Sequence, residues 1–129
     1  MNNTVLRKLG LSVFGGMLLV VAAQVMAGAV SKTVEAVHQE RKDLSGKQVS
    51  VSGKVVKVNN GIMKRNFLHI QDGTGAQGTN DLTITSAQTA NVGDQVTVTG
   101  TVVLDTDFGF GYQYPLLVEN SSIKVNKGK

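Results

Sequence analysis

Apolar residues recur at two different spacings along the chain, and the change from one spacing to the other divides it. Within residues 31–43 they recur three and four positions apart, as on one face of a helix. We expect a short helix there, capped by Ser31 or Thr33 and ended by Ser45-Gly46. His38 should be exposed on this helix or should cap it.

From residue 48 onward the apolar residues alternate with polar ones, which is typical of strands with one buried face. Val49, Val51 and Gly53 follow this alternation. The phase then slips at Val55-Val56, so that Val56 and Val58 are expected to carry the apolar face. A glycine followed by such a slip indicates a bulge in a long, curved strand. Further strands are expected at residues 66–71, 81–85, 95–104 and 114–125.

Turn-forming residues separate these strands. We expect turns at residues 59–61, 72–75, 91–94 and 109–111, and a break in the last strand at Asn120-Ser121. Residues 73–78 match the G-x-G-x-x-G pattern of dinucleotide-binding proteins. That pattern requires a helix after it, whereas here it leads into a strand, so we interpret it as a hairpin loop.

The strand pattern predicts the fold class. Five strands, with a long bulged first strand and a short connector between the third and the fourth, predict an all-β protein with a five-stranded OB-fold barrel. A small β-sandwich is the alternative. A chain of 129 residues has room for one such domain. We assign residues 28–47 to the short helix and a linker, 48–125 to the OB-fold domain and 126–129 to a tail.

The first 27 residues have the pattern of a signal peptide. Arg7 and Lys8 form a basic segment, an apolar stretch follows, and Val25-Met26-Ala27 fits the small-residue cleavage rule. Cleavage after Ala27 would place the protein in the periplasm without a stable membrane anchor. The alternative is a retained transmembrane anchor, because residues 11–30 carry no charge and are long enough to span a bilayer. Interruption of the apolar stretch by Gly15-Gly16 and Gln24 favours cleavage.

Charge and composition narrow the possible functions. Removal of Arg7 and Lys8 from 13 basic residues leaves only a small excess over nine acidic ones, too small to argue for nucleic acid or an anionic membrane. The chain has no cysteine, which excludes disulfides, thiolate zinc sites and covalent c-type haem. The sequence also lacks the G-x-S-x-G and H-E-x-x-H motifs of hydrolases. We therefore expect a binding protein rather than an enzyme.

The second predicted strand carries the first candidate binding residues. If Leu68 and Ile70 face the core, Phe67, His69 and Gln71 must face outward, because side chains alternate along a strand. OB folds commonly bind ligands on this outer surface. The alternative is that the helix or a loop covers Phe67 and makes it a minor core residue.

Two predicted loops flank that surface. The first contains Met63, Lys64 and Arg65. The second contains four of the five aromatic residues of the mature domain, and its polar and aromatic members are Asp105, Asp107, Phe108, Phe110, Tyr112 and Tyr114. Aromatic rings beside basic residues can stack on bases or sugar rings. Alternatively, the second loop packs on itself and covers the mouth of the barrel.

Met63 and His69 suggest a metal site. A thioether and an imidazole form a soft ligand pair suited to Cu(I). A third ligand would have to be His38, an aromatic face or an exogenous group, because the mature chain has no cysteine and no other methionine.

Four segments together resemble a family of small exported OB-fold proteins. These segments are residues 46–58, 63–75, 92–94 and 107–114. Members of the family are labelled nucleic-acid-binding-like by fold, and some are encoded beside cytochrome c nitrite reductase. The resemblance implies an OB fold in the periplasm. Tryptophan is common in the family where this chain has Phe67, and phenylalanine is a weaker cation-π platform than the tryptophan of periplasmic OB-fold copper and silver chaperones.

Three functions follow from these residues. In the first, the protein is a periplasmic accessory protein that binds Cu(I) through Met63 and His69 and supports assembly of a respiratory metalloprotein. In the second, it binds an oligonucleotide or oligosaccharide; the stacking residues would be Phe67, Tyr112 and Tyr114, and the phosphate-binding residues Lys54, Lys57, Lys64 and Arg65. Export, together with Asp105 and Asp107, argues against nucleic acid. In the third, exposed aromatics anchor a partner protein.

Overall fold

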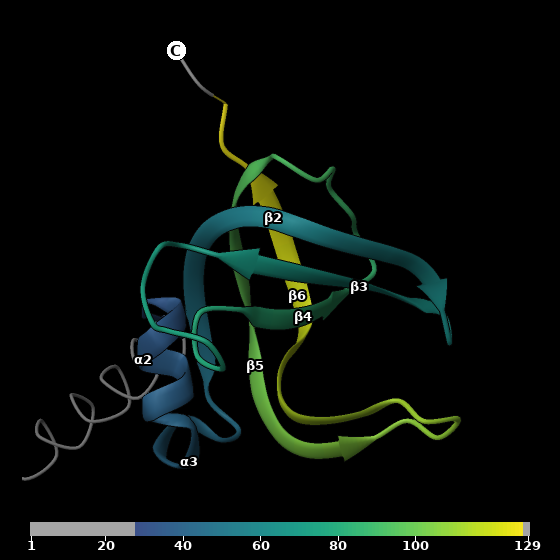
Figure 1. Ribbon diagram of the computed structural model, residues 1–129, viewed down its shortest axis with the longest axis horizontal. Coiled ribbons are helices and arrows are strands. Elements are labelled where there is room, and N and C mark those ends of the chain that lie inside the picture. The colour runs from purple at the N-terminus through teal and green to yellow at the C-terminus, as the bar shows by residue number, and fades with distance from the viewer. Residues whose placement is uncertain (1–27, 128–129) are drawn as a thin grey trace, which may run out of the picture.

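The computed structural model describes residues 28–127, so the predicted signal peptide at residues 1–27 lies outside the described part. The elements are β1 (Val30–Ser31), α2 (Val34–Gln39), α3 (Arg41–Leu44), β2 (Gln48–Ile62), β3 (Arg65–Gln71), β4 (Leu82–Ser86), β5 (Gln95–Asp107) and β6 (Gln113–Val125). Strands dominate, and the two helices are short (Figure 1). The predicted all-β class is therefore confirmed. Within residues 28–127, no helix is long and apolar enough to cross a membrane.

The strands form one sheet whose hydrogen bonding closes into a ring. Their order is β1-β2-β3-β4-β6-β5, and β5 also pairs with β2. β2 closes the ring because it is long enough to pair with two neighbours: residues 48–54 pair with β5, and residues 54–62 pair with β3. Figure 1 shows β2 curving around the other strands. The predicted number of five strands is one too low, because the two-residue strand β1 pairs in parallel with the start of β2.

The predicted bulge in β2 is present, but its phase differs from the prediction. The register shifts between Val55 and Lys57, which allows the strand to bend. Val55 is buried, whereas Val56 is 37% exposed, so the expectation that Val56 faces the core is wrong. The backbone explains the nearby glycine: a Cβ atom on Gly53 would lie 2.9 Å from the carbonyl oxygen of Gln71. Only glycine allows β3 to approach β2 so closely.

A second bulge lies where β6 was expected to break. Thr99 pairs with Ser122 and Thr101 with Glu119, so Asn120 and Ser121 together oppose a single residue of β5. The strand continues through the bulge rather than ending there. Asn120 adopts a φ of 53°, a left-handed conformation that asparagine tolerates better than most residues.

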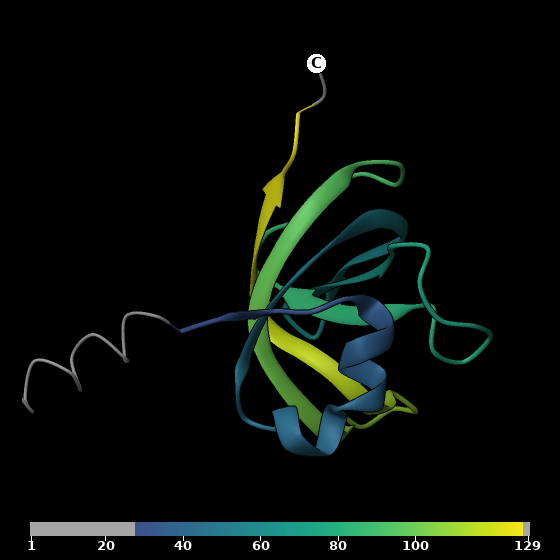
Figure 2. The ribbon, with the colours of Figure 1, turned by 90° about the vertical axis from the view of Figure 1, so that its left-hand side faces the viewer.

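The core fills the inside of the ring and is covered at one side by the helices. Valine, leucine and isoleucine side chains from β2 to β6 pack together with Val34, Val37 and Leu44. Figure 2 shows both helices together at one side of the ring of strands. Each fully buried side chain of this kind stabilises the fold by about 1.5–3 kcal/mol. The helical spacing read from the sequence therefore identified the face that covers the core.

The helical segment is shorter and less regular than predicted. Thr33 caps α2, because its hydroxyl accepts a hydrogen bond of 3.1 Å from the amide of Ala36. Ser31, the other predicted cap, lies in β1. Glu40 has a φ of −103° and a ψ of 15°, which separates α2 from α3. The glycine-rich residues 73–78 lie in the loop between β3 and β4, as expected.

Candidate functional site

Phe67 lies on the predicted face of β3 but is not exposed there. Leu68 and Ile70 belong to the core cluster inside the ring, and Phe67 lies on the opposite face. Only 2% of Phe67 is exposed. The ring centroids of Phe108 and Tyr114 lie 5.6 Å and 5.5 Å from that of Phe67. The expectation of an exposed Phe67 is therefore wrong, and the alternative, in which a loop covers it, is confirmed.

The rings over Phe67 form a small second core outside the ring of strands. Phe108 meets Phe67 edge-on at 86°, whereas Tyr114 stacks on it at 29°. Tyr112 lies farther away, with a centroid distance of 6.2 Å. Aromatic pairs in such arrangements contribute about 0.5–1.5 kcal/mol each beyond their buried area. Burial raises the pKa of Tyr114 above its ordinary value, and the neighbouring Tyr112 adds to this rise. We call Phe67, Phe108, Tyr112 and Tyr114 the aromatic cluster.

Arg65 connects the aromatic cluster to strand β6 through its interactions with Phe108 and Glu119. Its guanidinium carbon lies 4.6 Å from the centroid of the Phe108 ring, within the range of a cation-π interaction. Its Nη2 atom also donates to Glu119 Oε2 on β6 at 3.1 Å. Its Nη1 atom donates to the backbone carbonyl of Met63 at 3.4 Å. Arg65, predicted as a ligand-binding residue, therefore already has three partners. Lys64 is exposed and makes no ion pair within residues 28–127.

The turn between β2 and β3 is not where the asparagines and glycine predicted it. β2 continues through residues 59–61, and Ile62 pairs with Arg65 across a two-residue turn formed by Met63 and Lys64. Both turn residues have positive φ values, 51° and 65°, as a type I′ hairpin turn requires. The amide of Gly61 donates to Asn66 Oδ1 at 2.9 Å, which holds the end of the hairpin in place.

The loop between β5 and β6 is braced at its base and open at its tip. The amide of Phe108 donates to the carbonyl of Tyr112, and that of Tyr112 to the carbonyl of Gly109, both at 2.9 Å. Asp107 accepts hydrogen bonds from the Gly109 amide at 2.8 Å and from Gln113 Nε2 at 3.3 Å. The predicted ligand-binding residue Asp107 therefore serves to shape the loop.

Phe110 is at the tip of this loop. It is 93% exposed and has a φ of 53°, between Gly109 and Gly111, whose φ values are also positive. A left-handed conformation costs a non-glycine residue about 1–3 kcal/mol. The loop thus accepts backbone strain while placing a phenylalanine in solvent. Phe110 was named among the aromatic residues of this loop, but it was not predicted to bind a ligand; its position between two glycines is the signal that could have identified its exposure.

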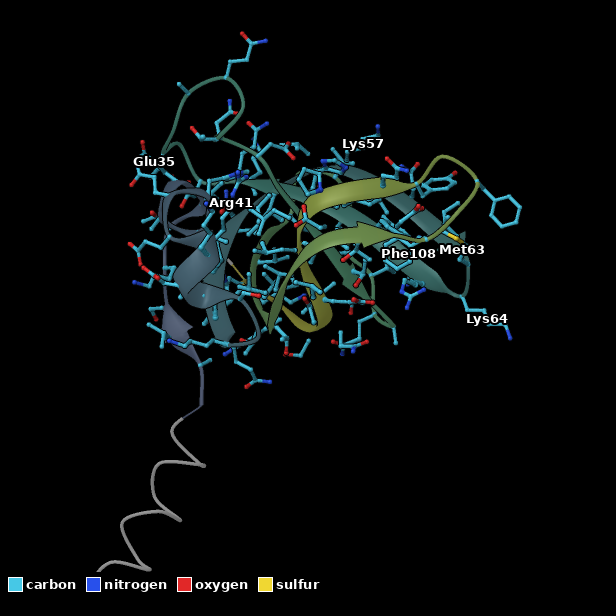
Figure 3. The ribbon with its side chains drawn as sticks, turned by 90° about the horizontal axis from the view of Figure 1, so that it is seen from below. Glu35, Arg41, Lys57, Met63, Lys64 and Phe108 are labelled. Carbon is cyan, nitrogen blue, oxygen red and sulfur yellow. The ribbon has the colours of Figure 1, made fainter. Side chains whose placement is uncertain are left out.

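Met63 and Phe108 lie at the same end of the molecule, together with Lys64, whereas Glu35 and Arg41 of the helical segment lie at the other (Figure 3). We call residues 61–65 and 107–113 the loop end. It combines a strained hairpin turn with an exposed phenylalanine, and it adjoins the aromatic cluster.

The structure does not bring Met63 and His69 together. His69 lies four positions after Arg65 on β3, a distance of about 13 Å from the turn at the rise of a strand. The Nδ1 atom of His69 lies instead 2.7 Å from Asp81 Oδ1. Among the residues that the structure describes, no group of three histidine, aspartate or glutamate side chains could hold a metal ion. Met63 and His69 are therefore not neighbours along the hairpin, and Cu(I) binding through this pair stays a prediction that a titration can test.

Asp81 gathers three side chains that were singled out from the sequence. Besides His69, Gln71 Nε2 donates to Asp81 Oδ2 at 3.2 Å. The Nε2 atom of His38 lies 2.7 Å from the backbone oxygen of Asp81 and donates to it. His38 was expected to be exposed or to cap the helix; instead, it connects α2 to the start of β4. These contacts are structural, because they join the helix, β3 and the β3–β4 loop.

Comparisons with known proteins support the fold alone. No family model and no curated protein matches the sequence, whereas 28 chains of solved structures match the fold. One of these, described as an aspartyl-tRNA synthetase from Leishmania major Friedlin, is 14% identical to this chain. The match has a TM-score of 0.54 and covers 75% of this chain but 20% of that one. This chain therefore spans about a fifth of the length of that protein.

Proposed function

We propose that this chain is an exported, non-enzymatic binding module of OB-barrel type that docks a partner protein through its loop end. The observation that carries the proposal is Phe110, which is 93% exposed at the tip of a braced loop. Among residues 28–127, no aromatic pair includes Phe110. Exposed aromatic residues on a rigid support are typical anchors of protein interfaces.

Two features support the OB-type barrel. The strands β2, β3, β4, β6 and β5 pair in a closed ring, and β2 takes part in two sides of it. β2 is also bulged at the point where it changes partner, as small closed barrels require. The two-residue strand β1 is then an addition to a five-stranded barrel.

The covered aromatic cluster favours a protein over a base or a sugar as the ligand. A stacking ligand would need the face of Phe67, and that face is occupied by Phe108, Tyr112 and Tyr114. Opening it would disrupt three aromatic pairs. Phe110, in contrast, is available without any rearrangement. The resemblance to exported proteins encoded beside a nitrite reductase makes a periplasmic respiratory metalloprotein the partner that we propose.

The free energy of binding indicates how much of the loop end the partner must contact. Burial of one phenylalanine contributes about 1.5–3 kcal/mol, whereas a dissociation constant of 1 mM already requires about 4 kcal/mol. Phe110 alone is therefore insufficient. The partner must offer a concave surface that contacts the hairpin turn as well as the loop tip.

Photo-crosslinking tests this proposal. A photoreactive phenylalanine analogue replaces Phe110 in the full chain, expressed in the organism that encodes it, and the matched control carries the analogue at Val92, which is 63% exposed in a different turn. We expect one discrete adduct from position 110 and none from position 92. Excess unlabelled wild-type protein should suppress the adduct, and excess Phe110→Ser protein should not. Equal suppression by both competitors would overturn the proposal.

A further inference from the structure

A pocket of about 300 Å³ opens beside the hairpin turn of the loop end. Its lining includes Lys64 and Arg65 from the hairpin, Thr85 from β4 and Asn120 from the bulge of β6. The lining contains two cations and no carboxylate. Arg65 also contacts Phe108 of the aromatic cluster, so the pocket adjoins the surface that presents Phe110.

Several residues that line this pocket carry hydrogen-bond donors that make no hydrogen bond within residues 28–127. Thr85 is 1% exposed, and its hydroxyl accepts a hydrogen bond of 3.4 Å from the Asn120 amide. No atom of residues 28–127 accepts the proton of that hydroxyl. A buried donor that makes no hydrogen bond costs about 1–3 kcal/mol. The side chains of Lys64 and Asn120 likewise make no hydrogen bond within the described chain, so three donors remain available.

Backbone strain is concentrated around the same pocket. Five non-glycine residues between residues 28 and 127 have positive φ values, and three of them line the pocket: Met63, Lys64 and Asn120. Strained residues persist where the surrounding structure holds them, and they gather at binding sites. The hairpin turn and the β6 bulge thus hold the lining residues in fixed positions.

We infer that this pocket binds a carboxylate, and, resting on the proposed function, that this carboxylate belongs to an acidic side chain of the partner protein. Unpaired donors beside two cations match the oxygens of an anion. Glu119 neutralises part of the charge of Arg65, which leaves the site suited to a single negative charge rather than to a phosphate dianion. A C-terminal carboxylate is typically held by backbone amides, whereas the donors here are side chains.

The interface that follows has two adjacent parts. Phe110 fills an apolar recess of the partner, and an aspartate or glutamate beside that recess enters the pocket next to Lys64. The acidic residue sets the orientation of the partner, because the pocket lies to one side of the loop tip. An acidic group near an apolar recess is therefore the chemical signature by which the partner is recognised.

The pocket can be tested without the partner. The 15N-labelled protein, expressed from the full chain, is titrated with sodium acetate and, separately, with inorganic phosphate, with sodium chloride at equal ionic strength as the reference. We expect saturable amide shifts at Met63, Lys64, Thr85 and Asn120 with acetate, and weaker binding of phosphate. The absence of saturable shifts with acetate, or tighter binding of phosphate, would overturn the inference.

Two lysine variants separate the pocket from general attraction by charge. Lys64→Gln should weaken acetate binding about fivefold, as expected for loss of one largely exposed charge contact. Lys57→Gln is the matched control, because Lys57 is also an exposed lysine and lies on β2 opposite His69, outside the lining of the pocket. Equal weakening by both variants would exclude a specific site.

A third variant separates this inference from the proposed function. Phe110→Ser should leave acetate binding unchanged, since Phe110 does not line the pocket. If acetate fails to bind but Phe110 still governs crosslinking, only the carboxylate site is refuted. If acetate binds and position 110 gives no adduct, the carboxylate site is supported and the docking proposal is refuted.

Discussion

Phe67 of β3, beside the loop end, and Phe110, within the loop end, have opposite surroundings. Phe67 is almost fully buried and contacts three other rings. Phe110 lies two residues from Phe108 in the same loop, yet nearly all of it is exposed. The first stabilises the loop on the strands, and the second is free to contact another molecule.

Substitution of these two residues should have clearly different effects on stability. Phe67→Ala should lower the free energy of unfolding by about 3–5 kcal/mol, because it leaves a cavity in the aromatic cluster. Phe110→Ser should change the free energy of unfolding by less than about 0.5 kcal/mol, as is usual for exposed positions. Urea unfolding of each variant measures this difference. A large loss from Phe110→Ser would show that Phe110 is part of the fold rather than an anchor.

At the scale of elements, the β3–β4 loop supports the short helix α2. The Val34 amide donates to Asp72 Oδ2 at 2.9 Å, and the Glu35 amide donates to Thr74 Oγ1 at 3.0 Å. These bonds satisfy amides at the start of a helix that is too short to be stable by itself. Burial acts to raise the pKa of Asp72, but hydrogen bonds from the Thr74 hydroxyl and from the amides of Val34 and Thr74 outweigh it and hold that pKa below its ordinary value.

The charge of Asp72 should make the free energy of unfolding depend on pH. A carboxyl group whose pKa is lowered by folding stabilises the protein above its ordinary pKa, and this contribution is lost as the pH falls through the lowered value. Asp72→Asn keeps an acceptor oxygen without the charge. At pH 7, the free energy of unfolding of the Asp72→Asn variant should be about 0.5–1 kcal/mol lower than that of the wild type, because a negative charge stabilises the start of a helix.

This difference should shrink as the pH falls below about 4, the ordinary pKa of aspartate. Chemical denaturation at several pH values measures it. A difference that stays constant down to pH 2 would mean that the charge of Asp72 contributes nothing to the cap.

At the scale of the whole molecule, the candidate ligand residues singled out from the sequence lie in different regions. Met63 lies at the loop end, whereas His69, Gln71 and His38 all contact Asp81. The Asp81 contacts join the helix to the strands. The loop end, in contrast, presents side chains without partners in the described chain.

Copper titration should reflect this separation. We expect the protein to bind Cu(I) no more tightly than background in the presence of a competing chelator, because Met63 and His69 are held apart. The Met63→Ala and His69→Ala variants should therefore titrate like the wild type. Tight one-to-one binding that both substitutions abolish would contradict the arrangement described here.

Much of the fold could be predicted from local pattern. The alternation of apolar residues located the five main strands, and the helical spacing located Val34, Val37 and Leu44 on the covered face. The bulges at Val55 and at Asn120 were also visible as breaks in the pattern. These features follow from neighbours within one element, so the sequence alone carries them.

The candidate site was predicted less well, because its residues meet through contacts between distant segments. The face of Phe67 was correct, but its cover comes from rings more than 40 positions away. The pocket combines the β2–β3 hairpin, β4 and the bulge of β6, and no sequence spacing joins these three segments.

The sequence by itself thus determined the five main strands, most of their buried faces and the absence of cysteine chemistry. Tertiary structure decided which outward-facing residues are covered and which remain free. The physical reason is that alternation sets the direction of a side chain relative to its own strand. Its exposure depends on what the rest of the chain places over it, as Phe108 and Tyr114 are placed over Phe67 while Phe110 is left uncovered.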